Sequence, residues 1–383
     1  MKSKKPMIAT MLLVSMFQMG MVALSPVVAS ITTAFPGTSQ TTAQLAMTFL
    51  CLVLVIFALF SGQISRAIGR RMMCALGMLL TTIAGICGTC LTVALWTAFL
   101  WSALLGAGTG MFVPAVSSMM IDFLNDDERS KVAGVQSAFV NLGGMLLSFF
   151  SGIFAAGRWS NAYLVYLASV PVFVMCLLFL PKEPHVTAQT GSAPRSRIPG
   201  AVWLAALQTF VFAVLYFAFS TNVSLLLAER GIGSTSLSGT ATGIFMLGGC
   251  LFGMAFSKVI GTCKGATPGV AFLLVALSYL IIYFTNGVAP LLIAAFIGGG
   301  SLSLIFPYFL IAIAGKVDPT ISVISTSLIL SVAPNFGSFV SPMILTNLSA
   351  VIFGGAVSSR FLLAAIAAAV LGVLLAVLAR REK

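Results

Sequence analysis

The eight acidic residues of this 383-residue chain all fall between long apolar runs or at their ends, never in the middle of one. The runs are about 20 residues long, the length that a helix needs to cross the roughly 30 Å hydrocarbon core of a bilayer. A helix satisfies its own backbone hydrogen bonds, so runs of this kind predict membrane-spanning helices. The chain holds about twelve such runs. It is therefore predicted to be an all-α, multi-pass membrane protein with twelve transmembrane helices.

The basic residues predict the orientation of these helices. Of the 20 Lys and Arg residues, only Arg158, Arg230 and Arg360 fall on the side opposite the chain ends. This positive-inside bias predicts that both termini are cytoplasmic. We expect the protein to span the plasma membrane, which in bacteria is the inner membrane. The net charge of +12 then reflects topology, and no nucleic-acid partner is expected.

The chain repeats itself at a spacing close to half its length. The glycine-rich segment that ends at Pro114 recurs as a segment that ends at Pro307, and 307 minus 114 is 193. The segment Asn141-Leu-Gly recurs as Asn335-Phe-Gly, and 335 minus 141 is 194. Two independent landmarks at nearly one offset predict that the first and last six helices are parallel copies.

The repeat predicts the domain organisation. We expect one six-helix bundle over residues 1–181 and a second, pseudo-symmetric one over residues 200–383. Residues 182–199 form a polar stretch with Ser, Thr, Gln and Pro, too polar to build a core. They are predicted to be a cytoplasmic linker between the two bundles.

The loop between the second and third predicted spans carries a motif. It begins Gly62-Gln-Ile-Ser-Arg66 and continues Ala-Ile-Gly69-Arg70-Arg71. In the major facilitator superfamily of secondary transporters this loop reads Gly-x-Leu-Ala-Asp-Arg-x-Gly-Arg-Arg. The chain keeps both glycines and the final arginine pair, while Arg66 stands at the acidic position. With its six-plus-six repeat, the chain therefore resembles that superfamily, and within it the drug-exporter-like members.

The resemblance implies a role for the loop. Its arginines would help to latch the two halves together in the outward-facing state, through a partner at the end of the fourth helix. The alternative is that they only anchor the topology among lipid headgroups. The residues predicted for the latch are Gly62, Arg66, Gly69, Arg70, Arg71 and Asp122.

The side chains expected near mid-depth of the membrane are polar but neutral. No charged residue is expected there, and the twelfth helix is apolar from Phe361 until Arg380, as expected for a helix that faces lipid. In the resembling family, the polar helices line a central cavity. The alternative for each residue is a hydrogen bond between helices, worth about 0.6 kcal/mol on average. The predicted substrate-binding residues are Gln18, Asn141, Tyr216, Asn222, Ser301, Tyr308 and Asn335.

These features favour a transporter over other functions. An enzyme would need catalytic or metal-binding residues, but the spans lack them, and the single histidine, His185, has no metal partners in sequence. No metal or cofactor is expected. We predict a functional monomer that moves a small neutral, zwitterionic or lipophilic solute by alternating access, with export favoured and no strict proton coupling. The alternatives are facilitated uptake or exchange of a small metabolite, or a membrane sensor that does not transport.

Overall fold

The fold is helical throughout the part of the chain that the structure describes. The computed structural model describes residues 4–182, 199–314 and 325–381, and no strand occurs among them. Twelve helical stretches are long and apolar enough to cross a membrane. The prediction of an all-α protein with twelve spans is confirmed. His185 and most of the predicted linker lie outside the described residues.

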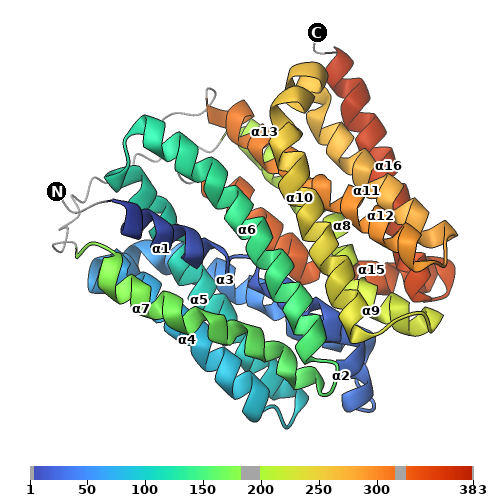
Figure 1. The fold of residues 1–383 in the computed structure, drawn as a ribbon. Helices are drawn as coiled ribbons and strands as arrows, with labels where there is room; N and C mark the ends of the chain where they lie inside the picture. Colours follow the sequence, from blue (N-terminus) through green and yellow to red (C-terminus); the bar gives the residue numbers. More distant parts are fainter. Residues whose placement is uncertain (1–3, 183–198, 315–324, 382–383) are drawn as a thin grey trace. The chain divides into compact units, whose positions relative to one another are not determined.

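The chain forms two compact units, Met1–Thr190 and Gly191–Lys383. Both are traced in Figure 1. The first unit contains α1 (Lys5–Ser15), the 3-10 helix η1 (Gly20–Val27), α2 (Val28–Ala34), α3 (Gln40–Ile68), α4 (Arg70–Cys90), α5 (Leu95–Phe123), α6 (Asp126–Phe154), the 3-10 helix η2 (Trp159–Ala168) and α7 (Ser169–Phe179). The second contains α8 (Gly200–Tyr216), α9 (Ala218–Arg230), α10 (Thr235–Cys263), the 3-10 turn η3 (Lys264–Ala266), α11 (Thr267–Phe284), α12 (Val288–Gly300), α13 (Leu302–Ala314), the π-helical turn η4 (Leu328–Val332), α15 (Ala333–Phe353) and α16 (Val357–Arg381).

The internal repeat is confirmed at the level of individual contacts. In α6 the amide of Asn141 donates to the carbonyl of Ser137 at 2.9 Å. In α15 Asn335 donates to Ser331 at 2.8 Å, and 331 minus 137 is again 194.

Glycines at the next turn repeat a helix contact. A Cβ on Gly143 would meet the backbone of Met16, and a Cβ on Gly337 would lie 2.5 Å from the carbonyl oxygen of Phe210. The two partners keep the offset of the repeat, since 210 minus 16 is again 194. The small residues Gly143 and Gly337 therefore let α6 and α15, the fifth span of each unit, lie against the first span of the same unit.

The first span of each unit is broken, and only in the first unit does the span contain a proline. In the first unit α1 ends at Ser15, a turn follows, and η1 contains Pro26. Proline lacks a backbone N–H and favours such a break. In the second unit α8 ends at Tyr216 and α9 begins at Ala218, with no proline nearby. There the cause is tertiary, because the hydroxyl of Tyr279 in α11 contacts backbone atoms on both sides of the break.

The first turn of the twelfth span contains a buried charged residue. The helix begins at Val357, and Arg360 lies in its first turn. The side chain of Arg360 is only 2% exposed. Arg360 is therefore a buried charge near the end of a span, and not at the mid-depth positions where no charge was expected.

Candidate functional site

The loop between α3 and α4 is held in place by its two arginines and a glycine. Arg70 forms an ion pair with Asp122 at the end of α5, with 2.5 Å between Nη1 and Oδ2. The guanidinium of Arg71 donates to the carbonyl of Leu177 in α7. Gly69 has a φ of +78° and a ψ of 152°, a conformation that is essentially restricted to glycine. The loop thus binds α4 to α5 and α7 within the first unit.

The other two motif residues contribute less to this geometry. Arg66 is exposed and donates through Nε to the carbonyl of Gly62, one turn earlier in its own helix. A Cβ on Gly62 would meet nothing within 4 Å. A glycine in a tight turn between two helices is needed where backbones approach each other or where φ is positive. The structure shows no such approach at Gly62, and the requirement for glycine falls on Gly69 alone.

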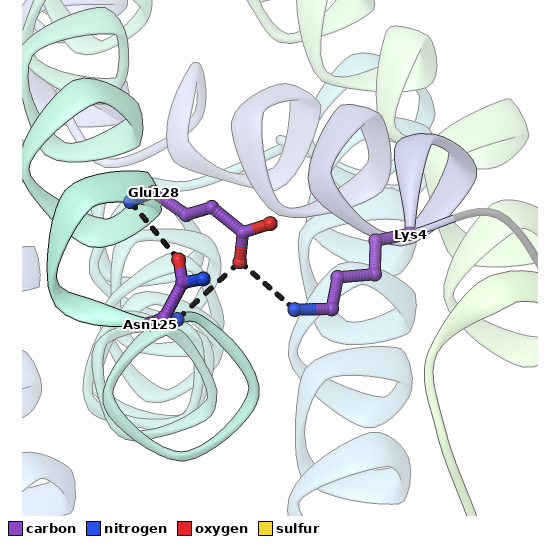
Figure 2. A network of polar contacts seen from close by, with 3 residues as sticks. All are labelled: Lys4, Asn125 and Glu128. Atoms are coloured by element: carbon purple, nitrogen blue, oxygen red, sulfur yellow. Dashed lines mark hydrogen bonds and ion pairs between the residues drawn. The ribbon is translucent and has the colours of Figure 1, made fainter.

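The start of the chain is bound to the start of α6 by a second ion pair. Figure 2 shows Glu128 between Asn125 and Lys4. Glu128 and Asn125 form a reciprocal capping box, in which Asn125 Oδ1 accepts from the backbone N–H of Glu128 at 3.2 Å. Lys4 Nζ lies 2.8 Å from Glu128 Oε2. The hydrogen bond from Lys4, followed by that from the Asn125 N–H, lowers the pKa of Glu128.

The predicted substrate-binding residues of the first unit lie on the broken first span and on α6. Gln18 is partly exposed and lies in the turn between α1 and η1. Asn141 is 6% exposed, and its amide nitrogen bonds Ser137 as described. Its carbonyl oxygen is buried and has no hydrogen-bond partner among the described residues.

Tyr216 lies in an aromatic cluster at the end of α8. Its ring stacks on Phe212 at 5.5 Å between centroids and lies 4.7 Å from Phe245. The side chain is 1% exposed. Its hydroxyl, like the Asn141 carbonyl oxygen, has no hydrogen-bond partner among the described residues.

The remaining candidates in the second unit are in different situations. Ser301 is fully buried and donates to the carbonyl of Gly298 in its own span. Tyr308 is partly exposed beside the ring of Phe309, and Asn335 is partly exposed.

Asn222 is fully buried in a polar network that the sequence analysis missed. Its Oδ1 accepts from Nη1 of Arg360 at 2.9 Å. Its amide nitrogen donates to the carbonyl of Ala218 at 2.9 Å and to the hydroxyl of Thr221 at 3.0 Å. In this structure the amide of Asn222 is therefore engaged within its own unit.

A weak signal for Arg360 exists in the repeat. Position 360 minus 194 is 166, and Tyr166 also points a polar group at the first span of its unit, donating to the carbonyl of Gly20 at 2.7 Å.

Comparison with known proteins identifies the fold. The sequence matches the family model described as Major Facilitator Superfamily over residues 8–342. No curated protein matches the sequence. A POT family transporter in complex with 5-aminolevulinic acid has a similar structure, with a TM-score of 0.77 at 15% identity, over 98% of this chain and 96% of that one.

Two further solved structures are similar over nearly the whole chain. The peptide transporter POT in complex with sulfate has a TM-score of 0.76 at 14% identity, over 98% of this chain and 94% of its own. A mutant of the nucleoside transporter NupG also has a TM-score of 0.76, at 12% identity, over 97% of this chain and 98% of its own. Likeness at this level of identity shows a common fold.

Proposed function

Because the chain belongs to the major facilitator superfamily of membrane transporters, we propose that it exports a small neutral, zwitterionic or lipophilic organic solute by alternating access. The observation that supports this substrate class is the charge of the interior. Among the described residues, one charged side chain, Arg360, is buried, and it is bonded to Asn222 in its own unit. A strongly anionic or cationic substrate would need an opposite charge to replace its hydration.

The substrate-binding atoms that we propose first are those with unused hydrogen-bonding capacity. The carbonyl oxygen of Asn141 and the hydroxyl of Tyr216 are buried without a partner among the described residues. A buried polar group of this kind is costly unless it is paired in some state of the protein. Gln18, Asn335 and Tyr308 are partly exposed, and they complete the proposed set of substrate-binding residues.

Ser301 and Asn222 are weaker candidates in this conformation. The hydroxyl of Ser301 and the amide of Asn222 already bond atoms of their own unit. They would bind substrate only in a state in which those bonds open.

For the loop between α3 and α4 we propose the latch that the resemblance implies. Arg70 and Asp122 are its central pair, supported by their ion pair in the first unit. Both groups would lie at the cytoplasmic face of a protein that works as a monomer in the plasma membrane. We propose no strict proton coupling, because Asp122 and Glu229 are exposed at the ends of their helices.

A dye accumulation assay tests the proposed export. Cells that express the wild type should accumulate less of a lipophilic fluorescent dye than cells with an empty vector. The Gln18→Ala/Asn141→Ala variant should lose this effect. Asn347→Ala is a matched control, because this exposed asparagine is outside the proposed set. Equal accumulation in all cells, at equal protein levels, would refute export of such compounds.

The same assay tests coupling. Addition of a protonophore should leave the wild-type effect in place, and Asp122→Asn should not abolish concentrative transport by itself. Loss of the effect in either experiment would show that the proposal on coupling is wrong.

A further inference from the structure

The turn after α10 and the last turns of α16 lie together at one end of the second unit. The α10 helix ends at Cys263, η3 follows over Lys264–Ala266, and α16 ends at Arg381. Figure 1 draws the turn after α10 and the end of α16 at the same end of this unit. A Cβ on Gly265 would lie 3.5 Å from the Cβ of Ala379. The short helix η3 therefore lies against the end of α16.

Glycines bring α16 close to α11 near this end. A Cβ on Gly269 of α11 would lie 2.7 Å from the carbonyl oxygen of Gly372 and 2.9 Å from the backbone nitrogen of Ala376. A Cβ on Gly372 would in turn lie 3.0 Å from the carbonyl oxygen of Gly269. Small residues of this kind let helix backbones approach each other in a membrane. The place of the last turns of α16 beside η3 is therefore fixed by helix packing.

Basic residues gather at this end without acidic ones. Lys264 of η3 is exposed, α16 ends with Arg380 and Arg381, and the exposed Lys258 lies six residues before Lys264. In the described part of the second unit the only acidic residue is Glu229, which accepts hydrogen bonds from the start of α16, at its opposite end. Neither lysine forms an ion pair with a described residue. This end of the unit is therefore strongly basic.

Lys264 adopts a backbone conformation that does not suit lysine. Its φ is +47° and its ψ is −123°, and it is the only residue other than glycine with a positive φ in the part of the chain that the structure describes. Such conformations are strained for a residue with a Cβ, and they persist where a structure or a ligand requires them. A glycine follows directly at Gly265. The chain thus holds a basic side chain at a position where glycine would be unstrained.

An exposed apolar face of α16 leads to the basic residues. Its side chains are between 44% and 62% exposed and are spaced by three and four residues, which places them on one face of the helix. They are Val370, Val373, Leu374, Val377 and Leu378. The order along this helix is an apolar face followed by basic residues. A phospholipid presents its groups in the same order, with acyl chains in the membrane and phosphates at its surface.

We propose that this end of the second unit binds an anionic phospholipid of the cardiolipin class, which carries two phosphate groups. The phosphates bind Lys264 and the last turn of α16, and the acyl chains lie along the exposed face of α16. Basic groups between helices at a membrane surface are suited to such headgroups. Several basic residues without an acidic neighbour match two phosphates better than one. The site is distinct from the residues proposed to bind the transported solute.

Native mass spectrometry of the full-length protein in non-ionic detergent tests this proposal. The probe is tetraoleoyl cardiolipin, and dioleoyl phosphatidylcholine is the zwitterionic comparison. Lys264→Gln should weaken cardiolipin binding by about fivefold, and Arg380→Gln/Arg381→Gln by about 25-fold, from the contribution of each basic group at a membrane surface. Lys182→Gln is the matched control. It removes an exposed positive charge from the first unit and should leave cardiolipin binding unchanged.

Two further variants separate the charge of Lys264 from its backbone. Lys264→Arg keeps the charge and should bind cardiolipin as the wild type does. Lys264→Gly removes the charge and also relieves the strain. It should bind cardiolipin as weakly as Lys264→Gln, yet unfold at a higher temperature than Lys264→Gln in detergent without lipid. The same unfolding measurement shows that each variant is folded.

Four results would overturn the proposal. The first is equal binding of cardiolipin and phosphatidylcholine. The second is cardiolipin binding that neither Lys264→Gln nor the double arginine variant weakens. The third is an equal loss in Lys182→Gln, which would indicate a general effect of surface charge. The fourth is displacement of cardiolipin by inorganic phosphate, since the acyl chains belong to the proposed site. No solute is transported in this experiment, so its failure and failure of the dye assay are distinct results.

Discussion

The close contact of α3 and α5 at Gly110 leads to a quantitative prediction. A Cβ at this position would lie 2.6 Å from the carbonyl oxygen of Leu54, 2.7 Å from Cβ of Phe57 and 3.2 Å from the backbone nitrogen of Ala58. Ordinary contact begins at 3.4 Å, so Gly110→Ala must separate the helices locally by at least 0.8 Å, which is 3.4 minus 2.6. Two of the three neighbours are backbone atoms and cannot rotate away.

The expected cost follows from two opposing effects. Overpacking of this kind costs about 1–3 kcal/mol, and the rigid neighbours of Gly110 place it near the upper limit. Alanine regains about 1 kcal/mol because it favours helix over glycine. The net loss is about 2 kcal/mol, which for a unit of this size lowers the unfolding temperature by about 4–8 °C.

Gly134 in α6 provides the matched control. A Cβ there meets nothing within 4 Å, so Gly134→Ala should be neutral or raise the unfolding temperature by about 1–4 °C. A thiol-reactive dye can follow thermal unfolding in detergent, because the thiols of Cys51, Cys74 and Cys176 are buried in the folded protein. If Gly110→Ala proved as stable as Gly134→Ala, the reasoning from helix proximity would be refuted.

Three further variants test other parts of the structure. Gly69→Ala should cost about 1–3 kcal/mol because its backbone conformation suits only glycine, whereas Gly62→Ala should be neutral in the same thermal assay. The lowered pKa of Glu128 stabilises the fold above the unfolded value of about 4.3, and this contribution is lost as the pH falls through the folded pKa. Glu128→Gln should therefore be less stable than wild type at pH 7, and this difference should shrink as the pH falls through the folded pKa of Glu128; a difference that does not shrink on acidification would contradict this assignment. Tyr279→Phe should cost about 1–3 kcal/mol by leaving backbone groups unpaired, and an effect no larger than that of Tyr283→Phe, at a partly exposed tyrosine, would refute its role at the break.

The parts of the fold that could be predicted depend on local composition and repetition. Apolar length alone indicates twelve spans, because a bilayer imposes the same length on each of them. The recurrence of Asn141 as Asn335 predicts two copies of one bundle. The structure extends that repeat to Ser137 and Ser331, whose carbonyls accept from the two amides.

The break in the seventh span could not be predicted in this way. Around Phe217 the sequence is apolar, lacks proline and suits a continuous helix. The break depends on the hydroxyl of Tyr279, which belongs to a different span, and no local pattern records that contact. Arg360 was missed for a related reason, since a charge near the end of a span reads as a loop residue until its buried partner is known.

The two units use different side chains to bond the backbone of their broken helices. This difference explains why a charged residue can be buried in the second unit. In the first unit the hydroxyl of Tyr166 donates to the carbonyl of Gly20, beyond the break. Gly85 leaves space for Tyr166, since a Cβ on Gly85 would lie 3.1 Å from the Cβ of Tyr166. At the offset of the repeat, the corresponding positions in the second unit are Arg360 and Tyr279. In the second unit Tyr279 already bonds the backbone groups at the break. The side chain at position 360 is therefore not needed as their partner. Arginine there can reach α9 instead, which gives the second unit a charged connection between its first and last helices.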